Sequence, residues 1–194
     1  MVSRKKKKSR KYLLVYILLV VGVFAAGAWV GPLLREKGYQ IKDWVIQPRL
    51  PREMKVVKLY FSDPQAEHLI LEEREVVALP HMGEEAKEIL KELIKGPLDN
   101  SLKPTVPLQT EVENVYVKGD RFYVNFSSSL QEKHPGGSSG ELLTIYSIVN
   151  TLLINFPSQS QVQILIEGKP AETLAGHIDI RNPLGKRLDI IKEP

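Results

Sequence analysis

The hydrophobic pattern of the chain begins with one long apolar run. Residues 12–34 carry no charge and are mostly aliphatic. About 20 apolar residues can cross the roughly 30 Å hydrocarbon core of a bilayer, so a transmembrane helix is predicted over residues 12–31. Seven Lys and Arg residues lie within residues 1–11, and the positive-inside rule places this basic tail in the cytoplasm. The pattern therefore predicts a single-pass cell-membrane protein with an extracytoplasmic domain and the lipid bilayer as a partner.

A cleaved signal peptide is the alternative interpretation of this run. Ala26, Gly27 and Ala28 have the small side chains that a signal peptidase accepts, which allows cleavage after Ala28. A signal-peptide apolar region is typically about 7–15 residues, shorter than this run, which favours a retained helix. Residues 32–53 combine proline, glycine and mixed charges, and this composition predicts a linker or stalk.

Beyond the stalk, short runs of alternating apolar and polar residues predict β-strands. In the first run, Val57, Leu59 and Phe61 share one face, and Phe122, Val124 and Phe126 share a face later in the chain. A weaker final strand is expected at Leu174–Ile180. The other strands are expected at Met54–Phe61, Leu71–Leu79, Val112–Val117, Phe122–Phe126 and Gln161–Glu167.

Two segments have the three-to-four-residue apolar spacing of a helix. The first runs from Glu84 to Lys95 and ends at a Gly-Pro pair. The second begins at Ser138, and Glu141 three residues later predicts a capping box in which the two side chains bond each other's backbone amides. The polar segment Ser127–Gly140 before this helix is expected to be a loop.

These elements predict an α+β fold. We expect a single small mixed sheet of about five or six strands with two helices on one face, preceded by the transmembrane helix. The folded domain is placed at residues 54–185, and residues 186–194 are taken as a C-terminal tail.

Charge and cysteine content narrow the function. The chain has a net charge of +4, but outside residues 1–11 it carries 20 basic and 23 acidic residues, a net charge of −3. The basic tail is explained by the span beside it, so no nucleic-acid partner is expected. Cysteine is absent, which excludes disulfides, thiolate metal sites and a cysteine nucleophile in this sequence. No cofactor is indicated.

Candidate chemistry is sparse. Ser138 or Ser139 with His177 and Asp179 supplies the residue types of a hydrolase triad, but no G-x-S-x-G nucleophile elbow is present. The four histidines do not form an i, i+4 pair, so no metal site is predicted. Together these observations predict that the protein is not an enzyme.

The Gly136–Glu141 loop is the candidate binding site. It lies just before a predicted helix, where free amides and the helix dipole favour anions. Gly137, Ser138 and Ser139 are the predicted ligand-binding residues.

The order of these motifs resembles the GerM domain, the sporulation and spore germination domain, over about residues 55–185. The capped helix that runs into Asn-Phe-Pro is the most specific part of the resemblance. The motifs that carry it are Lys58-Leu59-Tyr60-Phe61-Ser62-Asp63, Ile94-Lys95-Gly96-Pro97, Gly137-Ser138-Ser139-Gly140-Glu141, Ser147-Ile148-Val149-Asn150-Thr151-Leu152, Asn155-Phe156-Pro157 and Gly176-His177-Ile178-Asp179.

The resemblance implies an extracytoplasmic α/β module similar to the ring-building motifs of cell-envelope secretion assemblies, and it implies no catalytic residues. The leading hypothesis is a non-enzymatic interaction or assembly module of the cell envelope, with an envelope protein or a second copy as partner. Binding of a cell-wall or anionic ligand at Gly136–Glu141 is the alternative, and an envelope hydrolase is the third.

Overall fold

The computed structural model describes residues 15–23, 25, 30 and 53–192. The chain divides into two units, Met1–Leu50 and Pro51–Pro194, and each is described by itself. The described residues of the first unit are helical. The predicted tail over residues 1–11 and all but the last residue of the predicted linker over residues 32–53 lie outside the described residues.

The predicted membrane span requires a correction. Of residues 12–31, the structure describes 15–23, 25 and 30, and the remainder lies outside the described residues. Within the described part of the chain, no helix has both the length and the apolar character needed to cross a membrane. That finding overturns the predicted transmembrane helix and the single-pass localisation that was deduced from it.

One sheet of the second unit has three strands. β1 (Met54–Ser62) pairs antiparallel with β2 (Leu69–Val77), and the two-residue β7 (Ile191–Lys192) lies parallel to β2 on its other side. The alternation predicted for the first strand is confirmed, because the side chains of Val57, Leu59 and Phe61 are fully buried.

The second sheet has four strands. β3 (Val112–Lys118) and β4 (Arg121–Phe126) form an antiparallel hairpin. β5 (Gln161–Ile166) lies parallel to β4, and β6 (Lys169–Pro170) is antiparallel to β5. A parallel pair needs a long crossover connection, and here the chain between β4 and β5 contains two helices.

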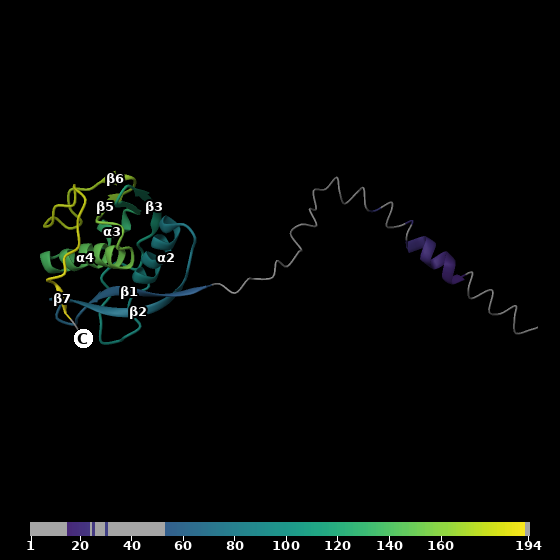
Figure 1. Ribbon diagram of the computed structural model, residues 1–194, viewed down its shortest axis with the longest axis horizontal. Coiled ribbons are helices and arrows are strands. Elements are labelled where there is room, and N and C mark those ends of the chain that lie inside the picture. The colour runs from purple at the N-terminus through teal and green to yellow at the C-terminus, as the bar shows by residue number, and fades with distance from the viewer. Residues whose placement is uncertain (1–14, 24, 26–29, 31–52, 193–194) are drawn as a thin grey trace, which may run out of the picture. The chain divides into compact units, whose positions relative to one another are not determined.

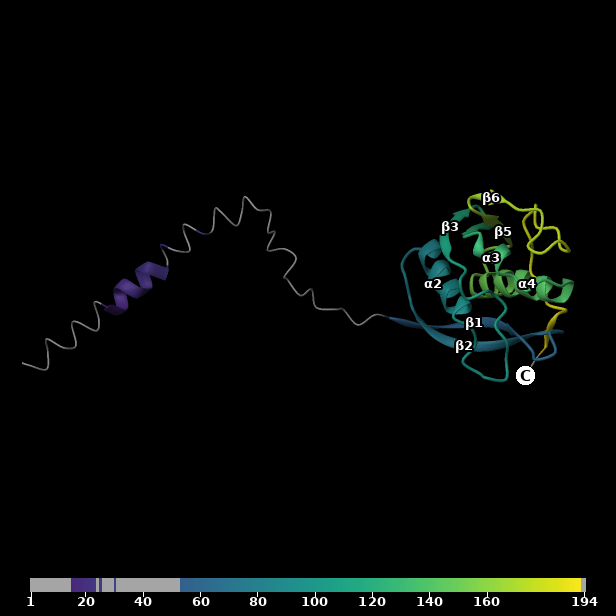
Figure 2. The ribbon, with the colours of Figure 1, turned by 180° about the vertical axis from the view of Figure 1, so that it is seen from behind.

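Two helices of the second unit, α2 and α4, lie between the two sheets. α2 (Met82–Ile94) contacts both β1 and β3, and α4 (Ser138–Asn155) contacts both β1 and β5. Figures 1 and 2 show β1 and β2 on one side of these helices and β3, β5 and β6 on the other. The prediction of a single sheet with two helices on one face is therefore wrong, since residues 53–192 contain two sheets with α2 and α4 between them.

The burial of α4 explains the central position of this helix. A helix that is buried all round belongs in a core, whereas a surface helix keeps one polar face. α4 buries apolar residues together with the polar side chains of Thr144, Ser147, Asn150 and Thr151. Asn150 shows how such groups are satisfied, since its amide donates to the carbonyl oxygen of Arg187 (2.8 Å) and accepts from the Arg187 amide (2.9 Å). Thr144, Asn150 and Thr151 thus hold other chain segments, and Ser147 bonds within the helix.

Two further segments differ from prediction. The expected strand Leu174–Ile180 contains no strand and is irregular. The expected loop Ser127–Gly140 contains a short helix, α3 (Ser129–Glu132), whose Leu130 is fully buried. The apolar stripe expected of the first helix is confirmed, because every predicted core position of α2 is buried: Ala86, Ile89, Leu90, Leu93 and Ile94.

Candidate functional site

The predicted capping box at the start of α4 is wrong. Gly137 is the N-cap residue, with φ 83° and ψ 141°, and no side chain caps the helix. This backbone conformation is accessible to glycine and almost excluded for other residues. Ser138 is the first helical residue, so its hydroxyl is displaced from the capping position.

Glu141 has a different partner from the one that its spacing predicts. Its side chain is fully buried. One oxygen, Oε1, accepts from the amides of Leu174 (2.8 Å) and Ala175 (2.9 Å), and Oε2 accepts from the His177 amide (2.8 Å). The carboxylate thus fixes the segment that the sequence predicts as a strand, and that segment is irregular because its amides face a side chain.

The environment of Glu141 determines its charge state. Burial alone would raise the pKa of this carboxyl group, but four backbone amides between Leu174 and Ile178 outweigh burial and lower the pKa. The His177 imidazole Nδ1 lies 3.0 Å from Oε2 and adds a further partner. Glu141 is therefore an ionised carboxylate inside the domain.

The residues considered for a hydrolase triad are engaged elsewhere. His177 pairs with Glu141, whereas Asp179 forms a two-pronged ion pair with Arg181, at 3.0 Å and 2.7 Å. The hydrogen bond from the Arg181 side chain is the main reason that the pKa of Asp179 falls to about 2. Ser138 and Ser139 are exposed at the start of α4. The carboxylate beside the His177 ring is therefore that of Glu141 and not that of Asp179.

His134 holds the loop that leads into α4. Its Nδ1 accepts the Gly136 amide hydrogen (3.0 Å), so the Nε2 nitrogen carries the ring proton and donates to the hydroxyl of Thr144 (3.0 Å). That hydroxyl donates in turn to the carbonyl oxygen of Thr105 (2.5 Å). Burial lowers the pKa of His134, which keeps the ring neutral in this arrangement.

His134 therefore presents Gly137, Ser138 and Ser139 at the surface, and all three are exposed. Exposure is necessary for ligand binding but does not demonstrate it. Their role in ligand binding stays a prediction.

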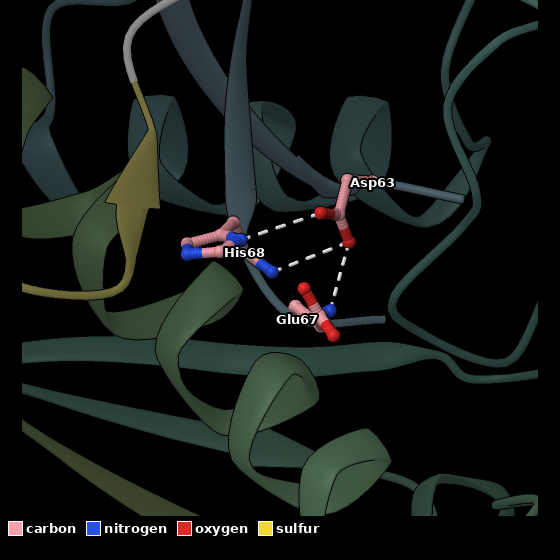
Figure 3. A group of neighbouring side chains, drawn as sticks. All are labelled: Asp63, Glu67 and His68. Atoms are coloured by element: carbon pink, nitrogen blue, oxygen red, sulfur yellow. Dashed lines mark hydrogen bonds and ion pairs between the residues drawn. The ribbon is translucent and has the colours of Figure 1, made fainter. Parts of the chain in front are cut away.

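A second cluster connects β1 to β2 and is drawn in Figure 3. Asp63 Oδ1 accepts from the amides of Glu67 (2.8 Å) and His68 (3.2 Å), and Asp63 Oδ2 lies 3.4 Å from His68 Nδ1. Ligand atoms of the three side chains lie within 4.8 Å of one another, a spacing that a metal ion could bridge.

The hydrogen bonds of the Asp63 carboxylate explain why these three residues cluster, because they hold the turn between β1 and β2. Burial would raise the pKa of Asp63, but the amides of Glu67 and His68 outweigh it and lower the pKa. We assign the cluster a structural role. The histidines are scattered in the sequence, and the signal that could have found this cluster is an aspartate four and five residues before Glu67 and His68.

A groove between α2 and the start of β3 was also missed by sequence reasoning. It has a volume of about 290 Å³. Lys87 of α2 donates to the carbonyl oxygen of Glu113 (2.5 Å), and a Cβ on Gly83 would lie 2.8 Å from the carbonyl oxygen of Val115. α2 therefore fits closely against β3. The residues that line the groove are Lys87, Lys91, Ile94, Thr110, Glu111 and Val112.

β3 is an outer strand of the four-stranded sheet, and two of its apolar side chains are exposed. Tyr116 is 58% exposed and Val117 is 39% exposed. α2 contacts the first half of the strand, through the carbonyl groups of Glu113 and Val115. Tyr116 and Val117 follow that contact and lead into the hairpin turn.

Comparison with solved structures shows the same fold in bacterial proteins. A Clostridium perfringens protein named "Putative Lipoprotein" is 25% identical, with 69% of this chain and 88% of that chain covered and a TM-score of 0.50. The first GerMN domain of the sporulation protein GerM from Bacillus subtilis is 24% identical, with 68% and 97% covered and a TM-score of 0.53. The tandem GerMN domains of the same protein are 20% identical, with 69% and 46% covered and a TM-score of 0.57.

Comparison by sequence gives a family. No protein with a curated description matches the chain. The Germane family model, described as "Sporulation and spore germination", matches residues 58–172, which is more than half of the chain. This range runs from within β1 to just after β6, so it contains both helices that lie between the sheets. The chain belongs to the Germane family of sporulation and spore germination domains.

Proposed function

We propose that the domain is a non-enzymatic protein-interaction module of the cell envelope that contacts its partner through the β3 edge. We define the β3 edge as the backbone and exposed side chains of Tyr116 and Val117. The observation that carries the proposal is the exposure of these two apolar side chains on an outer strand. An exposed strand edge presents unpaired amide and carbonyl groups that can pair with a strand of another protein.

The other sheet edges support this choice. β6 and β7 are two residues long, and β6 includes a proline that has no amide to donate. The free edge of β1 is occupied in its middle, since Asn155 and Thr151 of α4 bond the backbone of Lys58 and Tyr60. Among the described strands, β3 is thus a long outer strand with two exposed apolar side chains at one end.

The envelope context comes from the comparisons. The family model carries the description "Sporulation and spore germination". One solved relative is named "Putative Lipoprotein", and lipoproteins are held at a membrane surface. The absence of enzyme activity is part of the proposal. It is supported by the engagement of His177 with Glu141 and of Asp179 with Arg181.

Binding of a cell-wall or anionic ligand at Gly136–Glu141 is the second candidate. The exposure of Gly137, Ser138 and Ser139 at the N-terminus of an 18-residue helix favours it. The ionised carboxylate of Glu141 disfavours it, because that negative charge already lies in the first turn of the helix. The β3 edge has no such opposing feature and is therefore preferred.

A Val117→Lys substitution in the full chain tests the proposal. Lysine on a strand edge opposes pairing with another strand, so we expect chemical crosslinking in the native cells to give much less of a defined adduct. Val56→Lys is the matched control, because Val56 is 55% exposed on β1 of the other sheet. Equal adduct from the wild type and both variants, all shown to be folded by circular dichroism, would contradict the proposal.

A further inference from the structure

We propose that the groove between α2 and β3 binds the C-terminal carboxylate of a peptide chain. Lys87, Lys91 and Thr110 are the groups that recognise it. This inference rests on the proposed function and states the chemistry of the partner segment beside the β3 edge. The groove is lined by three residues of α2, by Val112 at the start of β3 and by the two residues before it, and β3 is the strand that carries that edge.

One side chain of the groove, Thr110, has a hydroxyl group without a partner within the described residues. Thr110 is 4% exposed and lines the groove, and its Oγ1 is shielded from solvent with no hydrogen-bond partner within the described residues. Buried hydroxyls are nearly always hydrogen-bonded, because an unpaired one loses its bonds to water without replacement. A ligand oxygen in the groove would supply the missing partner once the side chain that shields the hydroxyl changes rotamer.

The groove carries a net positive charge. Lys87 and Lys91 are four residues apart on α2, so their side chains lie on the same helix face. The Lys87 ammonium group donates one of its three hydrogens to the carbonyl oxygen of Glu113, and the other two can bond a ligand. Lys91 pairs with Glu88, which is on α2 but does not line the groove. The lining residues carry two positive charges against the single negative charge of Glu111.

The other lining residues and the size of the groove favour the end of a peptide over other anions. Glu111 would repel a compact dianion such as phosphate, but it can accept the backbone N–H that precedes a terminal carboxylate. Ile94 and Val112 are 8% and 6% exposed and supply apolar contact for a small aliphatic side chain. A volume of about 290 Å³ is at the small end of ligand pockets, which suits a chain end.

Calorimetric titration of the purified full chain tests the inference. The probes are acetyl-Ala-Val with a free carboxylate and the same dipeptide with a C-terminal amide. We expect saturable binding of the acid and binding at least about tenfold weaker for the amide, since hydrogen bonds to a charged group are the stronger ones.

Thr110→Val removes the hydroxyl while keeping the shape of the side chain, and it should weaken binding of the acid about tenfold. Thr105→Val is the matched control. Thr105 is also a buried threonine with an unpartnered hydroxyl, but it does not line the groove, so its variant should bind the acid as the wild type does. Thr110→Val removes an unsatisfied polar group, so we expect it to fold.

Three results would overturn the inference: no binding of the acid at millimolar concentration, equal binding of acid and amide, or equal affinity of the Thr110 and Thr105 variants. The same two experiments distinguish failure of the groove inference from failure of the β3 edge proposal. If the probe behaves as expected but the adduct in cells does not depend on Val117, the β3 edge proposal fails alone. If the adduct depends on Val117 but the acid does not bind, the groove inference fails alone.

Discussion

Glu141 carries a negative charge inside the protein, and its environment makes this tolerable. A carboxylate transferred out of water loses several kcal/mol of hydration unless donors replace the water. Here the donors are the amides of Leu174, Ala175 and His177 and the ring of His177. Each of these bonds also holds a residue of the irregular segment that follows β6. The carboxylate is therefore the fixed point on which that segment folds.

Glu141→Gln should lower the free energy of unfolding by about 3 kcal/mol at pH 7, because a neutral amide presents N–H groups to backbone donors. Urea denaturation monitored by circular dichroism measures the change. Glu132→Gln is the matched control, since Glu132 is exposed on α3, and it should change stability by less than about 0.5 kcal/mol. Equal stability of the two variants would contradict this role of Glu141.

The contribution of Glu141 to folding stability should depend on pH. The pKa of Glu141 is lower in the folded than in the unfolded chain, so the unfolded chain binds more protons as the pH falls. The stabilisation is present above the unfolded pKa of about 4.5 and is lost as the pH falls through the folded pKa. Wild-type stability should therefore fall more steeply below pH 5 than that of Glu141→Gln.

At the scale of residues, sequence could locate Glu141 but could not assign its role. A serine followed three residues later by a glutamate is the signature of a capping box. The structure has both residues at the start of α4, yet the partners of Glu141 are more than 30 residues away in sequence. The spacing predicts a local bond. The competing donors become visible only when the fold brings the two segments together.

At the scale of elements, α4 acts as a second partner for β1. The Asn155 side chain accepts from the Lys58 amide (3.0 Å) and donates to the Lys58 carbonyl oxygen (2.7 Å), as a neighbouring strand would. The hydroxyl of Thr151, one turn earlier, accepts from the Tyr60 amide (3.3 Å). These bonds satisfy the Lys58 and Tyr60 groups on the edge of β1 that β2 leaves open, and they attach the central helix to the three-stranded sheet.

Asn155→Ala should therefore release the edge of β1. We expect a loss of about 1 kcal/mol in the free energy of unfolding and faster hydrogen exchange at the Lys58 amide, because that amide would then bond only to water. Asn114→Ala is the control, as Asn114 is exposed on β3. Unchanged exchange at Lys58 in Asn155→Ala would show that α4 does not hold this edge.

Apolar periodicity predicted the long elements well and the short ones poorly. β1, α2, the β3–β4 hairpin, α4 and β5 all lie within a few residues of their predicted positions. β6 and β7 have two residues each, which is too short to show any alternation. Periodicity also gives no information on how strands group into sheets, so the two helices were assigned to one face of a single sheet when they lie between two sheets.

At the scale of the whole second unit, the two sheets and their helices leave few strand edges free. α2 and α4 each contact both sheets, so the apolar faces of β1 and of the β3–β4 hairpin are buried in one core. The outer strand β3 is covered by α2 along its first half and exposes Tyr116 and Val117 beyond it. Sequence could predict this hairpin, but not that β3 would be an outer strand or that α2 would form a groove with it.

The central claim is that this edge contacts another protein, and photocrosslinking from position 116 tests it most directly. Tyr116 in the full chain is replaced with a photoreactive phenylalanine analogue in the native cells, and the same analogue is placed at Leu188, which is equally exposed at 57%. We predict one discrete adduct from position 116, absent from position 188 and lost when Val117→Lys is added. No adduct from position 116, or the same adduct from both positions, would contradict the account.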